Sequence, residues 1–162
     1  MKNKSESGSV IISIDFEMRW GVHDLYGLNI DKYRKNLENS RPAVIHTLKM
    51  LEERKLRSTW ATVGALGLND WDEYFNLNPP IPDYKNKTLK ILDEYSNIDP
   101  KGHLHFAPDL IKKIIKTKGQ DLGSHSFSHL YFLEDGIKES DFIEDGLSVK
   151  KLFEKKFKKY NN

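Results

Sequence analysis

The stretch SVIISIDFE, residues 9–17, decides the fold of this 162-residue chain. Its apolar and β-branched residues run directly into a charge at Asp15, which predicts a short strand that ends there and is buried on both faces. The segment PAVIHTLKMLEERK then predicts a helix with Ser40 as its N-cap and Pro42 in its first turn. LRSTWATVGAL, residues 56–66, follows as a second strand. This order predicts a parallel pair of strands joined by a crossover helix.

The rest of the chain continues the alternation. APDLIKKIIKTKG predicts a helix that begins at Pro108 or Asp109 and stops at Gly119, and QDLGSH gives a very short third strand after it. Residues 69–104 carry few periodic signals, and we expect a long insertion that covers or shapes a site. Alternating strands and helices place the chain in the α/β class, where the chemistry lies beyond the carboxyl ends of the parallel strands.

Composition limits the classes of function. Lys and Arg number 26 against 24 Asp and Glu and are spread along the chain, so no nucleic-acid partner is expected. The basic C-terminal segment KKLFEKKFKKYNN has apolar residues at helical spacing, which favours a solvated helix face, near residues 141–158, over a membrane-surface or nucleic-acid tail. The start of the chain has too few apolar residues for a signal peptide or a membrane span. We therefore expect a cytoplasmic protein with a disordered segment at residues 1–8 and one domain at residues 9–162.

Two clusters carry residues that bind metals or move protons. His125 and His129 in DLGSHSFSH are four positions apart, a spacing at which two imidazoles can bind one ion from a helical turn or a tight loop. Taken alone, this pair also fits surface or hydrogen-bonded histidines. Asp15 and Glu17 are two positions apart, and carboxylates that face one side repel each other unless a cation or proton lies between them. A solvated strand end is the alternative for that pair.

Together the clusters have the composition of a catalytic zinc site. They supply two nitrogens, one carboxylate oxygen and a spare carboxylate, which matches three protein ligands, an open position for water and a nearby base. The chain has no cysteine, so any metal must be held by His, Asp or Glu. Asp121 either orients a ligand histidine or is an ordinary strand-end charge. The sequence lacks the Gly-x-Ser-x-Gly pattern of a serine hydrolase.

The motifs SIDFEMRWG, STWATVGALG and DLGSHSFSH, in this order and spacing, resemble those of the polysaccharide deacetylase family, the carbohydrate esterases with a NodB homology domain. The resemblance covers residues 9–135 and implies a partial (β/α) barrel. It implies that Asp15 is the catalytic base and that Glu17 is the acidic metal ligand. It further implies that His125 and His129 hold a divalent ion, zinc first and cobalt or nickel as alternatives. Many relatives have adjacent aspartates in place of Asp-x-Glu, which leaves open which of the two acids touches the ion.

The same resemblance implies an activity and a limit to it. Family members hydrolyse an acetyl amide or ester of an acetylated polysaccharide or amino sugar. They continue beyond the histidine pair through an Arg- and Pro-containing motif that holds the base and a Leu-x-His motif that supplies the acid, and neither occurs before Asn162. We therefore expect a truncated domain whose C-terminal barrel half is missing. Such a domain should have weak or no activity. It should also self-associate or bind a complementing C-terminal chain. The alternative is a non-catalytic metal-binding remnant or subunit that needs a partner chain.

Other residues near these motifs have two interpretations. Arg19, Trp20 and His23 follow the acidic pair and are candidates for lining a sugar cleft, although Trp20 suits the core equally well. His103 and His105 form an H-x-H pair between Gly102 and Pro108, which favours a structural or substrate-groove role, with a competing metal site as the alternative.

Overall fold

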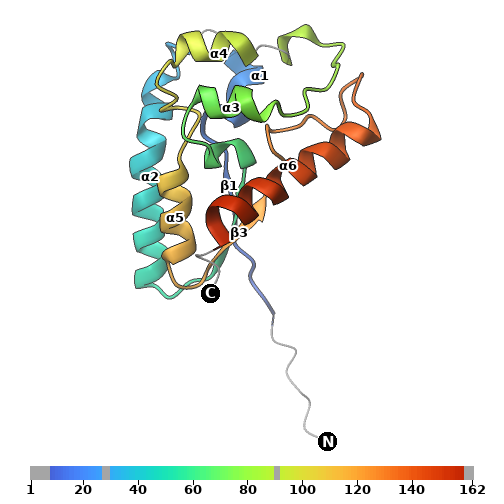
Figure 1. Ribbon diagram of the computed structural model, residues 1–162. Helices are drawn as coiled ribbons and strands as arrows, with labels where there is room; N and C mark the ends of the chain where they lie inside the picture. The colour runs from blue at the N-terminus through green and yellow to red at the C-terminus, as the bar shows by residue number, and fades with distance from the viewer. Residues whose placement is uncertain (1–7, 27–29, 90–91, 159–162) are drawn as a thin grey trace, which may run out of the picture.

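The computed structural model describes residues 8–26, 30–89 and 92–158 and has an α/β fold with a three-stranded parallel sheet (Figure 1). The strands are β1 (Ser13–Phe16), β2 (Ser58–Thr62) and β3 (Gln120–Ser124), in the spatial order β1-β2-β3. The α/β class, the three strands and their parallel pairing are therefore confirmed. The predicted disordered segment lies, up to residue 7, outside the described residues.

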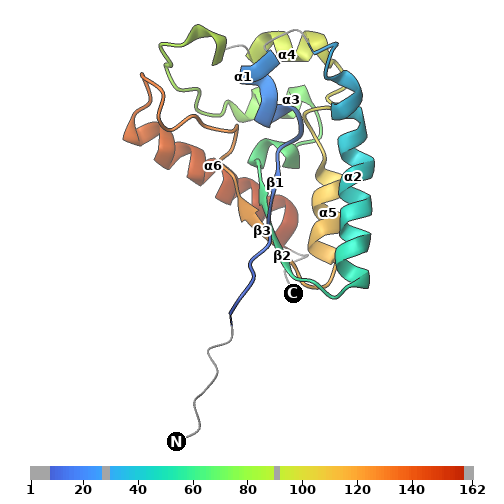
Figure 2. The ribbon, with the colours of Figure 1, turned by 180° about the vertical axis from the view of Figure 1, so that it is seen from behind.

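The crossover helices α2 (Arg34–Glu53) and α5 (Pro108–Lys116) lie side by side at one flank of the molecule, and α6 (Glu139–Phe157) lies at the other (Figures 1 and 2). α5 begins at Pro108 as predicted, since a helix needs no N–H donor in its first turn. The core between the sheet and helices α2 and α5 includes Phe16, Trp60, Leu48, Leu51, Leu110, Ile111 and Ile114. This packing fixes the direction in which the strand ends point.

The start of α2 differs from the prediction. The helix begins at Arg34, so Pro42 lies in its interior, and Ser40 donates its hydroxyl to the Leu37 carbonyl instead of capping the helix. Proline in a helix interior removes one hydrogen bond and costs roughly 3 kcal/mol. Burial of Leu37 against Ile30 and residues farther along the chain offsets this cost.

β1 is buried on one face only, so the prediction of a strand buried on both faces is wrong. Ser13 and Asp15 are exposed, whereas Phe16 is buried. Asp15 pairs in register with Ala61, which in turn pairs with Gly123, and these small residues leave the second face of the sheet open. The Asp15 carboxylate is therefore accessible from that face.

The segment 69–104 contains short helices that its sequence pattern did not reveal. They are α3 (Trp71–Leu77), the 3-10 turn η3 (Lys87–Leu89) and α4 (Leu92–Ile98). Together with η1 (Met18–Val22) and α1 (His23–Tyr26), they gather over the carboxyl end of the sheet (Figures 1 and 2). Each of these helices completes at most about two turns, which is too short for a clear helical period.

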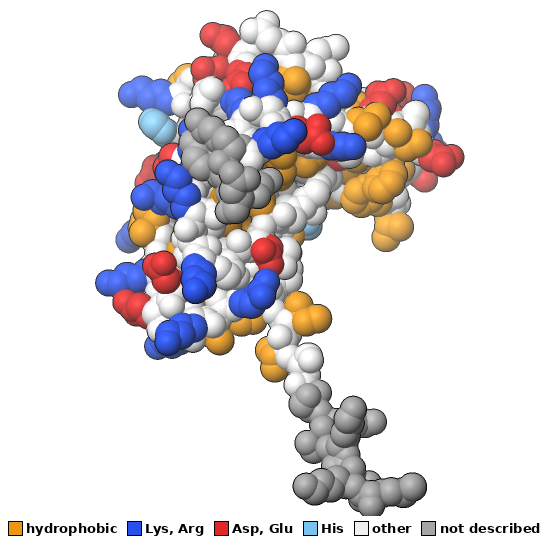
Figure 3. All heavy atoms as spheres, turned by 60° about the horizontal axis from the view of Figure 1, so that its bottom comes forward, with side chains coloured by type: hydrophobic (Ala, Val, Ile, Leu, Met, Phe, Trp, Pro, Cys, Tyr) orange, Lys and Arg blue, Asp and Glu red, His pale blue; other side chains and the backbone are white. Residues whose placement is uncertain are grey.

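α6 confirms the helix predicted near residues 141–158, and its C-terminal part confirms the helix face predicted for the basic segment. It packs along η2 (Gly64–Gly67), the turn that follows β2. Gly64 permits this approach, because a Cβ there would lie 2.9 Å from Val149 of α6. Acidic and basic side chains are interspersed on the face drawn in Figure 3. No helix in the described ranges is long and apolar enough to cross a membrane.

Candidate metal centre

The register of the sheet places the ends of β1 and β3 at one level. Phe16 of β1 pairs with Thr62 of β2, and Thr62 pairs with Ser124 of β3. Glu17 and His125 are therefore each the first residue beyond the same row of the sheet. The His125 N–H donates to the Thr62 carbonyl at 2.9 Å and extends this pairing by one residue.

Three of the predicted ligands converge at this edge. Glu17 Oε2 lies 3.3 Å from His125 Nε2 and 3.1 Å from His129 Nε2. A tetrahedral ion with bonds of about 2.0–2.1 Å separates its ligand atoms by about 3.3–3.4 Å. The three side chains therefore fit a zinc-sized ion, and no other set of three or more His, Asp or Glu in the described residues has such a geometry.

The Glu17 carboxylate is suited to this role electrostatically. A hydrogen bond with His129 holds the pKa of Glu17 below its ordinary value, while burial acts in the opposite direction. Ligand carboxylates must be ionised and ligand imidazoles neutral to bind a metal. Without an ion, the same contacts form a hydrogen-bonded carboxylate and histidine cluster, so the alternative of hydrogen-bonded histidines stays open.

The two histidines lie in a tight loop, residues 125–129, which we call the histidine loop. Ser126 and His129 both have a φ of +59°. Such left-handed backbone costs roughly 1–3 kcal/mol for each residue and persists where surrounding contacts enforce it. The N–H groups of Gly64 and Ala65 donate to the Ser126 and Phe127 carbonyls at 2.9 and 2.8 Å, which ties the histidine loop to η2.

Asp145 of α6 holds the same loop from the interior. Its two carboxylate oxygens lie 2.8 and 2.9 Å from the Phe127 backbone nitrogen, and the carboxylate also accepts from the Ser128 backbone. Burial raises the pKa of Asp145 to about 6, and these hydrogen bonds oppose the rise. The role of this residue was not predicted from the sequence. A signal existed, because Asp145 shares the buried stripe of α6 with Val149 and Leu152, where a charge is unexpected.

The Glu17 side chain extends toward the two histidines across the space that the missing side chain of Gly21 leaves free. A Cβ at Gly21 would lie 2.0 Å from the Glu17 carboxyl carbon, so a larger residue would displace the ligand side chain. Met18, with a φ of +48°, turns the chain from β1 into η1 and brings Gly21 beneath Glu17. Gly21 was also missed, because its role depends on where the Glu17 side chain lies.

Asp15 is not part of the three-residue group. It is exposed, and the cavity of about 230 Å³ that it lines with Glu17 lies between β1 and α2 and is lined by neither His125 nor His129. The geometry therefore favours Glu17 as the acidic ligand and leaves the Asp15 carboxylate accessible to solvent beside it.

Arg19, Trp20 and His23, the predicted residues of a sugar cleft, are all buried. Their exposed fractions are 1%, 0% and 4%, because η1 and the start of α1 turn them toward the interior. Trp20 stacks on Tyr74 with ring centroids 5.6 Å apart. The burial of these three side chains does not support the predicted contacts with substrate. For Trp20, burial supports the alternative interpretation of the sequence, a role in the core.

His23 lies directly behind the candidate ligands, with its ring centroid 6.4 Å from that of His129. Burial lowers the pKa of His23 to about 4, with smaller contributions from His129 and Arg19. The imidazole is therefore neutral at neutral pH and is a poor proton donor there.

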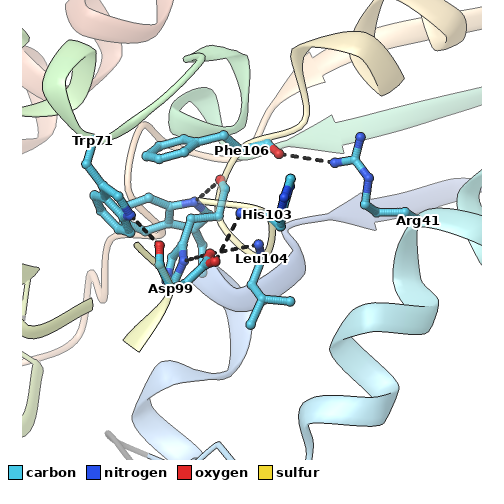
Figure 4. Close-up of polar contacts among 8 residues, drawn as sticks. Arg41, Trp71, Asp99, His103, Leu104 and Phe106 are labelled. Carbon is cyan, nitrogen blue, oxygen red and sulfur yellow. Dashed lines mark hydrogen bonds and ion pairs between the residues drawn. The ribbon is translucent and has the colours of Figure 1, made fainter. Parts of the chain in front are cut away.

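His103 and His105 do not form a second metal pair. His103 is exposed, whereas His105 is buried and donates from Nδ1 to Asp99 Oδ2 at 2.9 Å. Asp99 also accepts the N–H groups of His103 and Leu104 at 3.1 and 2.8 Å (Figure 4). Burial lowers the pKa of His105 although Asp99 opposes this effect. The structural role predicted for this pair is therefore supported by His105.

The loop that Asp99 holds also fixes η1. The Arg19 N–H donates to the Leu104 carbonyl at 3.1 Å, and Trp20 Nε1 donates to the His105 carbonyl at 2.7 Å. Because η1 directly follows Glu17, these two bonds set the position from which the ligand side chain starts.

Asp121 does not orient a ligand histidine. It lies near the start of β3, at the opposite end of the strand from His125, and it forms an exposed ion pair with Arg57 at 3.7 Å. It is the strand-end charge that the sequence left as the alternative.

Comparison of the chain with models of known protein families, with curated proteins and with solved structures finds no match. The functional interpretation therefore depends on residue types and on the geometry of the site.

The Gly21 contact predicts the effect of a single methyl group. Gly21→Ala should displace the Glu17 carboxylate and weaken zinc binding by roughly 10-fold or more, while the fold remains intact because a flexible side chain can move. Isothermal titration with zinc and circular dichroism measure the two effects. Gly146→Ala is the matched control, since a Cβ there meets no atom within 4 Å. Equal zinc affinities in the two variants would contradict the steric role of Gly21.

The buried imidazole of His23 predicts a loss of stability in acid. Its pKa of about 4 in the folded chain lies below the ordinary 6.5, so the unfolded chain binds more protons as the pH falls. The contribution of His23 to the free energy of unfolding should fall by about 2 kcal/mol between pH 7 and pH 5. Denaturant unfolding with a chelator present measures this change. It should shrink in His23→Gln and persist in His46→Gln, a variant of an exposed histidine.

Proposed function

We propose that the chain is a metal-dependent deacetylase of acetylated polysaccharide or amino sugar, whose sheet forms part of a (β/α) barrel of the NodB-like type. The observation that carries the proposal is the position of Glu17 Oε2, within 3.3 Å of both His125 Nε2 and His129 Nε2. The parallel order β1-β2-β3 with crossover helices supports it, because consecutive barrel strands are arranged in this way. The ligands also follow the strands at the edge where such folds carry their active sites.

Glu17, His125 and His129 are the residues that would hold the ion. Two imidazole nitrogens and one carboxylate oxygen suit zinc first, and cobalt or nickel as alternatives. When bound, such an ion polarises an acyl carbonyl and lowers the pKa of a water ligand. Three protein ligands leave a position open, which is typical of catalytic sites and not of structural ones.

Asp15 is the proposed base. Its exposed carboxylate lies two residues before Glu17, on the face of β1 that the sheet leaves open, so one of its oxygens can accept a proton from the water that attacks the acetyl carbon. The acetyl C–N or C–O bond then breaks, and acetate leaves the amino sugar or hydroxyl. The departing amine needs a proton, which protonated Asp15 or solvent returns to it, because His23 is neutral and buried near pH 7 and does not supply one. We therefore expect slow turnover by these 162 residues alone.

A second candidate is a non-catalytic subunit that binds a metal and a partner chain. The open face of the sheet beside Asp15 favours this function, because a second chain or a second copy could pack there. Exposed apolar side chains at Phe132, Leu133 and Phe142 provide a further surface for association.

Metal analysis tests the site. The purified chain should bind a single zinc, cobalt or nickel ion, and the double substitution of His125 and His129 by Ala should abolish binding, because the remaining carboxylates hold such an ion weakly against water. The matched control replaces His46 and His103, which are both exposed and lie outside the group. Full stoichiometry in the His125/His129 variant would place the metal elsewhere.

Acetate release tests the reaction. With zinc, the chain should release acetate slowly from acetylated amino sugars or chitooligosaccharides, and a chelator should stop it. Asp15→Asn should lower the rate by roughly 10²–10⁴-fold, which is the usual contribution of a proton-transfer group. Asp121→Asn, which removes an exposed carboxylate at the far end of the sheet, should leave the rate unchanged. Tight metal binding without acetate release, alone or with a complementing chain, would favour the second candidate.

A further inference from the structure

We infer that Asp145 is a positioning residue for the metal centre: its carboxylate holds the histidine loop in the conformation that points both imidazoles at Glu17. The inference rests on the proposed function, because it assigns a role in metal binding to a residue that does not touch the ion.

The contacts of Asp145 are with the backbone of the loop and not with its side chains. Both carboxylate oxygens lie within 2.9 Å of the Phe127 backbone nitrogen, and the Ser128 backbone adds a further hydrogen bond. Phe127 and Ser128 lie between the two histidines. A restraint on these residues therefore sets the direction in which the chain enters His129 and leaves His125.

Burial makes this restraint strong. Asp145 is 2% exposed and Phe127 is fully buried, so no bulk water replaces the hydrogen bond when the carboxylate is removed. The Phe127 ring also packs near Tyr74, with centroids 6.3 Å apart, and this contact keeps the loop in the core.

The backbone of the loop needs such a restraint. Ser126 and His129, on either side of the two restrained residues, both have a φ of +59°. A loop freed from Asp145 can relax from these conformations, and any relaxation at His129 moves its Nε2 from its position 3.1 Å from Glu17 Oε2.

The two acceptor oxygens of Asp145, and not its size, are the relevant property. A carboxylate has only acceptor oxygens, so it can accept from the Phe127 and Ser128 backbones together. In Asp145→Asn, one oxygen is replaced by an NH₂ group that is a donor and cannot accept from an N–H. The nearly isosteric variant therefore keeps the packing and one acceptor oxygen, and it loses the second acceptor and the charge that strengthens these hydrogen bonds.

The experiment compares wild type, Asp145→Asn and the control Glu144→Gln, which removes an exposed carboxylate from the neighbouring position of α6. Cobalt(II) titration followed by visible absorption reports affinity and coordination geometry. Amide hydrogen exchange of Phe127 and Ser128, measured on the metal-free chain, reports the loop itself. We expect Asp145→Asn to bind cobalt roughly 10–100-fold more weakly with an altered spectrum, to lose protection at one or both of the two amides, and to keep its helical circular dichroism.

Each outcome decides the inference. Cobalt affinity and spectrum equal to wild type in Asp145→Asn would overturn it, while cobalt binding by wild type would leave the metal site itself standing. Failure of wild type to bind cobalt would overturn both the metal site and this inference. If Asp145→Asn does not fold, exchange in the wild-type chain decides, because fast exchange of the Phe127 and Ser128 amides would show that Asp145 does not hold the loop.

Discussion

The parallel register of β1, β2 and β3 is the constraint on which the candidate site depends. Phe16, Thr62 and Ser124 share one row, so Glu17 and His125 leave the sheet at the same level. Neighbouring strands lie about 4.8 Å apart, which puts the outer two roughly 10 Å apart. Two long side chains leaning over the end of β2 cover this distance. A shift of one residue in either pairing would turn one of them to the opposite face.

The sheet alone does not bring the three candidate ligand atoms together, and three neighbouring groups complete the arrangement. Gly21 leaves space for the Glu17 carboxylate, the loop held by Asp99 fixes the turn that follows Glu17, and Asp145 holds the histidine loop. All three act through backbone position or empty space. The left-handed backbone at Ser126 and His129 belongs to a loop that Asp145, Gly64 and Ala65 all hold by hydrogen bonds.

The sequence predicted the local elements well and the long-range contacts poorly. The strands, α5 and α6 follow from apolar runs, Pro108 and helical spacing, and the ligand group follows from residues placed directly after strands. The start of α2 could not be predicted, because Leu37 is buried by Ile30 and other residues distant from Ser40. The burial of Trp20 and the role of Asp145 also depend on tertiary contacts, since an amphipathic ring suits a cleft or a core and a helical carboxylate is usually exposed.

The central claim is that Glu17, His125 and His129 bind one ion together. X-ray absorption spectroscopy of the zinc-loaded chain tests it most directly, because the spectrum distinguishes imidazole nitrogens from other light ligands and counts them. We predict two imidazoles together with oxygen donors, at bond lengths of about 2.0–2.2 Å. Zinc bound by oxygen alone or by a single imidazole, or no zinc bound at all, would contradict it.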